Sequence, residues 1–140
     1  LTVSLPEIVD NFYSKPWDMR WSLSGFDHFV GVVWDPFEKH SRLFIDQQVP
    51  VILDTAENNK AAAGTINAFY LTRMMQLQQD FEHHNVPEYW RNVFLLLLAY
   101  HCRKAKAYKV YMDIVDNLPK PLFWLVQDFY TKALPAQDGE

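Results

Sequence analysis

Cysteine is nearly missing from this sequence of 140 residues, which contains a single one at position 102. One thiol cannot form an intrachain disulfide, and it cannot supply a multi-cysteine zinc site, so both kinds of cross-link are excluded. The sequence also lacks an N-x-Ser/Thr acceptor for N-linked glycosylation. We therefore expect an intracellular protein, located in the cytoplasm, in which Cys102 is a small buried hydrophobic residue.

Glycine is also scarce, and its four positions are scattered along the chain. They form neither the G-x-x-x-x-G-K loop nor the G-x-G-x-x-G loop, which cradle the phosphates of nucleotides. Five histidines are present, but no H-E-x-x-H signature. His83 and His84 follow Asp80 at helical spacing, without a third or fourth ligand from the nearby sequence. The sequence therefore predicts no cofactor and no metal site.

No apolar run is long enough to cross a membrane as a helix, which takes ~20 residues. The longest run extends from Val93 to Tyr100. An apolar stripe at helical spacing continues from this run through Cys102, Ala105 and Tyr108. We therefore expect a helix of the protein core rather than a membrane span.

Positive charge is in the minority, since 13 Lys and Arg stand against 17 Asp and Glu and the formal net charge is −4. Nucleic-acid-binding domains are normally basic overall, so this balance argues against a nucleic-acid partner. One basic cluster is present, formed by Arg103, Lys104, Lys106 and Lys109. It is either a solvated helix face, with cations near a helix end, or a docking face for an acidic protein partner.

The length suits one domain with one hydrophobic core, and we predict that residues 1–140 form a single domain. Hydrophobic residues make up 49% and charged residues 21%, which is the balance of a globular rather than a disordered protein. The chain starts LTVSLPE, without an initiator methionine or a signal peptide. We expect it to be a fragment of a longer chain.

Short elements are predicted for the first half of the chain. Ser4 and Glu7 have capping-box spacing, which together with an apolar face predicts a helix over residues 4–14. β-Branched and aromatic residues then predict three short strands, at about residues 28–34, 42–46 and 49–53. We expect an antiparallel hairpin across residues 35–41. Pro50 either places the third strand at a sheet edge or demotes it to an extended loop.

Helical patterns take over after residue 54. Thr55 and Asn58 are candidate caps, and Asn85 with Pro87 ends one helix and begins the next. The predicted helices run from one of these two caps to residue 85, from 87 to 115 and from 121 to 134. The fold class is therefore predicted to be α+β, with an N-terminal helix, a small antiparallel strand segment and a three-helix C-terminal part. An all-α bundle with an irregular aromatic segment is the alternative.

Aromatic residues are abundant, at 16% of the sequence, with five Trp, seven Tyr and ten Phe. Several gather in the least regular part of the chain, near two prolines. This group comprises Trp17, Trp21, Trp34, Phe37 and Phe44, together with Arg20. The rings either complete the core or form a recognition surface, because Trp, Tyr and Arg are enriched in binding hot spots.

From the aromatic excess and the missing catalytic signature we predict a non-catalytic protein–protein interaction domain, with an adaptor or regulatory role. A protein or peptide partner would dock on a groove built from the aromatic group. The cations Arg103, Lys104 and Lys106 would steer acidic groups of that partner toward it. Homo-oligomerisation through the same surface is a further interpretation.

The alternative function is that of a small enzyme or ligand-binding domain. Asp27, His28, Asp35 and His40 gather carboxylates and imidazoles around the predicted hairpin. Such pairs act in general acid–base catalysis when they converge in a cleft. A deep pocket lined by these four residues would favour chemistry, whereas an exposed aromatic patch would favour binding.

Overall fold

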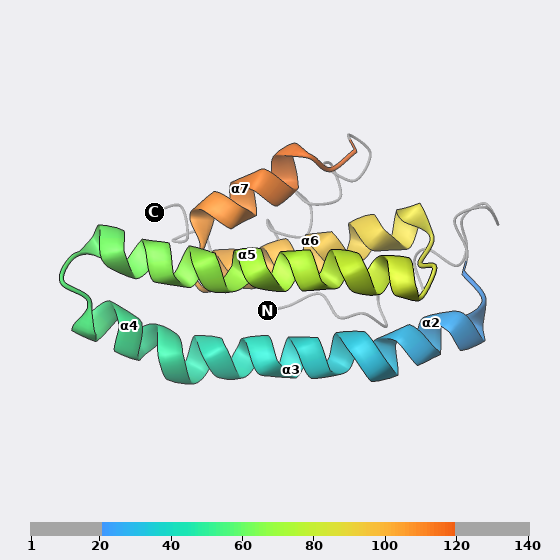
Figure 1. Ribbon diagram of the computed structural model, residues 1–140, viewed down its shortest axis with the longest axis horizontal. Coiled ribbons are helices and arrows are strands. Elements are labelled where there is room, and N and C mark those ends of the chain that lie inside the picture. The colour runs from blue at the N-terminus through green and yellow to red at the C-terminus, as the bar shows by residue number, and fades with distance from the viewer. Residues whose placement is uncertain (1–20, 120–140) are drawn as a thin grey trace.

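The structure is a computed structural model and describes residues 21–119. These residues are helical apart from short connections (Figure 1). The elements in chain order are α2 (Leu23–Phe29), η2 (Val30–Trp34), α3 (Asp35–Leu43), η3 (Phe44–Gln48), α4 (Val49–Thr55), α5 (Asn59–His83), α6 (Glu88–Lys104) and α7 (Tyr108–Asp116), where η marks a π-helical turn. The helices predicted at residues 4–14 and 121–134 lie outside the described residues.

The first five elements form one continuous helix, the long helix, which runs along the lower edge of Figure 1. The backbone torsions at its four junctions, Val30, Asp35, Phe44 and Val49, are all right-handed helical. In the two π-turns, the N–H of Asp35 donates to the carbonyl of Val30 and the N–H of Val49 donates to that of Phe44. Each bond reaches one residue further back than in an α-helix.

A proline lies two residues after the end of each π-turn. Pro36 comes after Asp35, and Pro50 comes after Val49. In a regular α-helix the proline ring would clash with the carbonyl four residues earlier and leave it without a donor. The wider turn in front of each ring gives it room, and the helix continues.

The buried residues of the long helix explain why two π-turns are present. They are Phe26, Phe29, Trp34, Phe37, Ser41, Phe44 and Val49. Their spacing is three or four residues, except across each π-turn, where it is five. Each π-turn holds one extra residue, and without it the spacing alternates between three and four, as on one helix face. The stripe therefore stays on one side of the long helix.

The predicted α+β fold is wrong, because the described residues contain no strand and form an all-helical fold. The expected hairpin at residues 35–41 lies within α3, and the long helix contains all three expected strands, at residues 28–34, 42–46 and 49–53. Short apolar runs indicate burial equally in strands and in helices. The gaps of five residues hide the helical period, and Pro50 argues against a helix interior at that position. The described part of the aromatic segment, which the all-α alternative takes as irregular, is helical from Leu23 onward.

The boundary between α5 and α6 follows the prediction. The side-chain oxygen of Asn58 caps α5 by accepting a hydrogen bond of 2.8 Å from the N–H of Ala61. Asn85 takes a left-handed φ of 53° after the end of α5, and α6 begins directly after Pro87. These are local capping features, which is why the sequence pattern predicts them.

The helix predicted over residues 87–115 is in fact two helices. α6 ends inside the basic cluster, and Lys106 lies in the connecting turn with a left-handed φ of 66°. The turn keeps Ala105 and Ala107 fully buried but exposes Tyr108, which the predicted stripe had placed in the core. α7 then packs on α6 and α5 (Figure 1).

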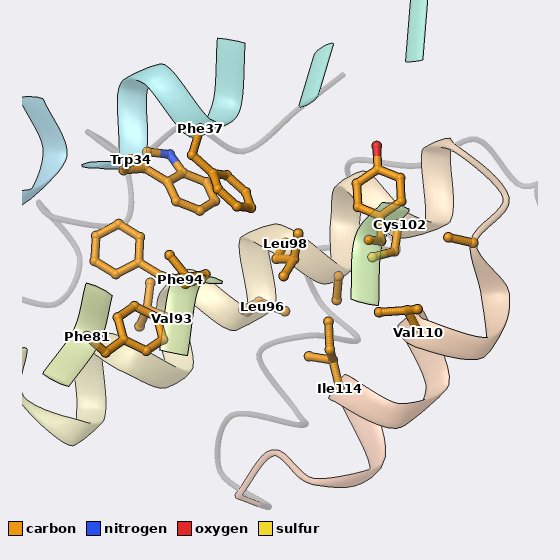
Figure 2. Packing of buried hydrophobic residues seen from close by; sticks show 14 of the residues in the cluster. Trp34, Phe37, Phe81, Val93, Phe94, Leu96, Leu98, Cys102, Val110 and Ile114 are labelled. Carbon is orange, nitrogen blue, oxygen red and sulfur yellow. The ribbon is translucent and has the colours of Figure 1, made fainter. Parts of the chain in front are cut away.

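Phe94 of α6 lies at the centre of the core, which Figure 2 shows from close by. Its ring centroid lies 4.9 Å from that of Phe29 and 5.2 Å from that of Trp34, both on the long helix. The ring of Phe81 on α5 lies 6.3 Å away. Tilted ring pairs at these distances stabilise a core beyond their buried area. Three helices therefore meet around Phe94.

The leucine-rich run of α6 is buried by this packing. Val93, Phe94, Leu96, Leu98 and Ala99 are each at most 1% exposed. Within residues 21–119, no helix has the length and apolar character to cross a membrane. The expectation of a core helix at this position is confirmed.

Candidate functional site

Three of the aromatic residues predicted to bind a partner lie in the core. Trp34, Phe37 and Phe44 are 3%, 5% and 5% exposed. Trp34 stacks on Phe37 at a centroid distance of 5.3 Å, and Phe44 stacks on Phe69 of α5 at 3.7 Å. These rings offer almost no exposed surface to a partner in this fold, so their main role is to stabilise the core.

Trp21 is partly exposed and lies beside the first turn of α2. Its ring packs on Phe29 at a centroid distance of 5.6 Å. A Cβ atom at Gly25 would lie 2.7 Å from the indole Nε1, so the close approach of this ring requires glycine there. Two further predicted binding residues, Trp17 and Arg20, lie outside the described residues.

The predicted basic residues lie together at the turn between α6 and α7. The guanidinium of Arg103 lies 5.7 Å from the ring centroid of Tyr111, and the ammonium of Lys104 lies 5.8 Å from that of Tyr100. Arg103 and Lys104 belong to the last turn of α6, where cations interact favourably with the helix dipole. The exposed Lys104 and Lys106 also leave positive charge at the surface.

A groove of about 460 Å³ runs between the long helix and α5. It is lined by Val32, Val33, Pro36, Phe37 and His40 from the long helix and by Arg73, Gln76, Gln79 and Asp80 from α5. The first wall is mostly apolar and includes part of η2 with the proline that follows it, so the widened turn helps to shape the groove. The second wall is polar. The volume of the groove lies in the range of ligand-binding clefts.

Arg73 is half-buried on the α5 wall of the groove. Its guanidinium lies 4.6 Å from the ring centroid of Phe37, and its Nη1 donates a hydrogen bond of 3.2 Å to Gln76. Among the described residues, its Nε has no hydrogen-bond partner and its charge has no ion pair. Burial lowers the pKa of Arg73, which the charge of Asp80 opposes. Because the side chain is only half-buried, its charge stays partly hydrated without an ion pair.

The residues of the enzyme alternative do not converge. Asp27, His28, Asp35 and His40 are all exposed and are spread over α2 and α3. Of these four, His40 alone lines the groove. General acid–base catalysis needs such groups within hydrogen-bond reach of one substrate. The described part of the chain therefore gives this alternative no geometric support.

Three imidazoles gather where α2 meets the end of α5. The ring of His84 lies 5.6 Å from that of His28 and 4.9 Å from that of His83, measured between centroids. Even so, the described residues contain no group of three or more His, Cys, Asp or Glu that could hold a metal ion. A protein zinc site needs at least three such ligands, so this cluster does not support a zinc site.

Cys102 is fully buried on α6, as predicted for a small hydrophobic residue. Burial raises the pKa of its thiol far above the ordinary value. Burial also raises the pKa of Tyr70, whose hydroxyl shares a hydrogen bond of 3.1 Å with Ser41. A reactive cysteine needs a low pKa and exposure, so nucleophilic chemistry at Cys102 is excluded in this conformation.

A polar cluster lies between α3 and α6. Glu38 forms an ion pair with Arg42 at 2.8 Å, and the Nε2 of His101 lies 3.9 Å from the same carboxylate. Burial, reinforced by the charges of Lys104 and Arg42, lowers the pKa of His101 to about 4. His101 is therefore neutral near pH 7, and its contact with Glu38 is not an ion pair.

Arg73 was missed by the sequence prediction, although a signal for it was present. Tyr70, Arg73, Leu77 and Phe81 are three or four residues apart, so the arginine falls on the apolar face of α5. A cation at such a position has to find a partner inside the protein or offer itself to a ligand. The groove itself was not predictable, because its other wall lies in the segment expected to form strands.

The groove with Arg73 is a site in residues 21–119 that joins exposed apolar surface to a charge without an ion pair. The other predicted site residues are either packed in the core, placed at the α6–α7 turn or spread along the long helix. A function can be proposed only from this geometry, because no family model, no curated protein and no solved structure matches this sequence.

Proposed function

We propose that this chain is a non-catalytic protein-interaction domain, with an adaptor or regulatory role, which binds a protein or peptide segment in the groove between the long helix and α5. The observation that carries the proposal is the groove. Its apolar wall stands opposite an arginine that has no ion-pair partner among the described residues. Shape, apolar area and charge are thus combined at one place, as in protein sites that bind peptides.

The apolar wall contributes part of the affinity. Val32 is 52% exposed, and Pro36 close to it is exposed as well. Single exposed apolar residues are ordinary, but these two border a concave surface that also includes part of Phe37. Covering them with a partner removes apolar area from water, which stabilises a complex by about 25 cal/mol per Å².

The positive charge at the α6–α7 turn supports an acidic partner. The ammonium groups of Lys104 and Lys106 are exposed there, and Arg103 adds to the same positive potential. Such a potential raises the association rate of an acidic protein and contributes less to the affinity itself. The net charge of −4 continues to argue against nucleic acid.

Location and assembly complete the proposal. A cytoplasmic location is supported by the single cysteine, which is buried as a free thiol. A second copy of the chain is the other candidate occupant of the groove. Sedimentation would detect it as an average mass that rises with protein concentration.

Selection of random linear peptides displayed on phage tests the proposal on the whole chain. We expect enriched peptides whose affinity falls at least tenfold, or about 1.4 kcal/mol, in a Val32→Asp variant. The reason is that an apolar group covering this carboxylate would strip its hydration at a cost in free energy, and an acidic group would be repelled by its charge. Failure to enrich any peptide would contradict the proposal.

Val51→Asp is the matched control. Val51 is 56% exposed on the same long helix but does not line the groove. Both substitutions replace a surface valine, so both variants are expected to keep a cooperative unfolding transition. An equal loss of peptide binding in the two variants would show that the peptides bind elsewhere.

A further inference from the structure

We infer that the groove recognises a carboxylate, carried by an aspartate or glutamate side chain of the bound segment, through the guanidinium of Arg73. The inference rests on the proposed function, because it names the chemistry of the segment that the groove takes. The occupant is an acidic peptide segment of a partner protein.

The guanidinium of Arg73 is held in place but not neutralised. It lies 4.6 Å from the ring centroid of Phe37 and 5.9 Å from that of Phe69. Its hydrogen bond from Nη1 goes to the neutral side chain of Gln76, which is three residues along α5. Because the rings orient the guanidinium plane before a ligand arrives, little side-chain freedom remains to be lost on binding.

The remaining edge of the guanidinium matches a carboxylate. Nε and Nη2 form the side-on edge that donates two parallel hydrogen bonds to one carboxylate. Nε is buried without an acceptor among the described residues, and the structure gives Arg73 no hydrogen bond other than the one to Gln76. An amide, with one acceptor oxygen and no charge, satisfies this edge only in part.

Access to this edge requires a local adjustment. Nε is covered by neighbouring atoms in this structure, so a side chain at the groove has to rotate before a carboxylate reaches it. Gln79 lines the groove, is exposed and forms no hydrogen bond with Arg73, so it can change rotamer, whereas Gln76 holds the guanidinium through its hydrogen bond. Side-chain rotations of this kind are common when a partner docks.

Asp80 limits the charge that the groove accepts. It lines the same wall as Arg73 and interacts with the arginine through its charge, without forming an ion pair with it. One carboxylate matches the single positive charge of Arg73, whereas a group with two negative charges leaves one charge unmatched beside Asp80. A singly charged carboxylate fits better than a phosphate, so an acidic segment is favoured over a phosphorylated one.

An NMR titration of the isotope-labelled whole chain tests the inference. The probes are N-acetyl-glutamate amide and its uncharged counterpart, N-acetyl-glutamine amide. We expect the glutamate probe to shift the Nε–H resonance of Arg73 and the methyl resonances of Val32 and Val33 along one saturable curve. Its affinity should exceed that of the glutamine probe at least tenfold. Equal affinities, or shifts confined to residues outside the groove, would overturn the inference.

Substitutions of arginine assign the effect to Arg73. Arg73→Met keeps an apolar stem over Phe37 but removes the donors, so the preference for glutamate, read at the valine methyls, should disappear. Arg73→Lys keeps the charge without the planar fork, and we expect an intermediate preference. This second variant keeps the test decisive if the first one unfolds. An unchanged preference in either variant would overturn the inference.

Arg42→Met is the matched control, because Arg42 is an exposed arginine of the long helix that does not line the groove. The preference for glutamate should be retained in it. Its loss in this variant would overturn the inference, because the preference would then not belong to the groove.

Inorganic phosphate and the selected peptides separate this inference from the proposed function. Tighter binding of phosphate than of the glutamate probe at Arg73 would overturn the choice of a carboxylate. Peptides that bind in the groove without any acidic residue would overturn the inference and leave the proposed function standing. A glutamate preference at Arg73 with no peptide enriched would uphold the inference and overturn the proposed function.

Discussion

Lys106 is a single residue whose backbone conformation decides where α7 goes. Its φ of 66° lies in the left-handed region, which costs a residue with a Cβ atom about 1 kcal/mol. The turn lets α7 fold back over α5, where the N–H of Val110 donates a hydrogen bond of 3.2 Å to the side chain of Asn67. The docking of α7 offsets the local strain.

We expect Lys106→Gly to raise the free energy of unfolding by about 1 kcal/mol, because glycine has no Cβ atom to clash at a positive φ. Urea denaturation followed by circular dichroism measures the change. Lys104→Gly, in the last turn of α6, is the control and should lower the same quantity by about 1 kcal/mol. A loss of stability in both variants would show that the left-handed turn is not the native conformation.

At the scale of elements, α5 and the long helix differ in how far the sequence predicts them. α5 has a cap at Asn58, a stop at Asn85 and a regular apolar period, all of which are local features. The long helix has the same period with one extra residue at two places, so a pattern of fixed period fails there. Its helical state depends on packing against α5 and α6, which no local pattern contains.

The candidate site was predictable only in part, for the same reason. Of the residues predicted to bind a partner, Phe37 alone lines the groove, and its ring is almost covered. Arg73 carries a local signal, since it is a cation on an apolar face. Its significance depends on the ring of Phe37 from another helix, and that proximity follows from tertiary packing alone.

Deletion of Gly31 from η2, combined with Pro36→Ala, should keep the free energy of unfolding within about 1 kcal/mol of the original value. Gly31 is exposed with open space around it, and its loss converts η2 into a regular α-turn while the buried stripe keeps its face. Deletion of Gly31 alone should cost about 3 kcal/mol, because Pro36 would then lie inside a regular α-helix. Urea denaturation measures the free energy of unfolding of both deletion variants.

Deletion of Lys39 is the matched control for this experiment. Lys39 is exposed within α3, away from both π-turns. Its loss rotates the preceding residues by about 100° relative to those that follow, so Phe37 and Phe44 no longer face the same neighbours. We expect cooperative unfolding to disappear. A Lys39 deletion as stable as the Gly31 deletion with Pro36→Ala would refute the proposed role of the π-turn.

For the molecule as a whole, His101 links stability to pH. Its pKa is about 4 in the folded state, below the ordinary value of 6.5, because the side chain is buried and lies near two cations. On acidification the unfolded chain therefore binds a proton at this residue before the folded chain does. The contribution of neutral His101 to the free energy of unfolding is complete above pH 6.5. It is lost as the pH falls from 6.5 to about 4.

We expect the original chain to lose roughly 3 kcal/mol more unfolding free energy than His101→Gln between pH 6.5 and pH 4. Urea denaturation at a series of pH values gives the difference between the two curves, which removes the contribution of the carboxylates. His28→Gln replaces an exposed histidine and should follow the original curve. Parallel curves for the original chain and His101→Gln would mean that folding does not hinder protonation of this side chain.

The two π-turns also bear on ancestry. Each adds one residue inside an uninterrupted helix, so a gene shorter by one codon there, with the following proline replaced, would still encode the same inward-facing surface. Descendants of a common gene can thus differ by single-codon insertions in mid-helix, where gaps are least expected when two chains are aligned. Kinship among such chains is better sought by matching their inward-facing positions than by matching continuous residue order.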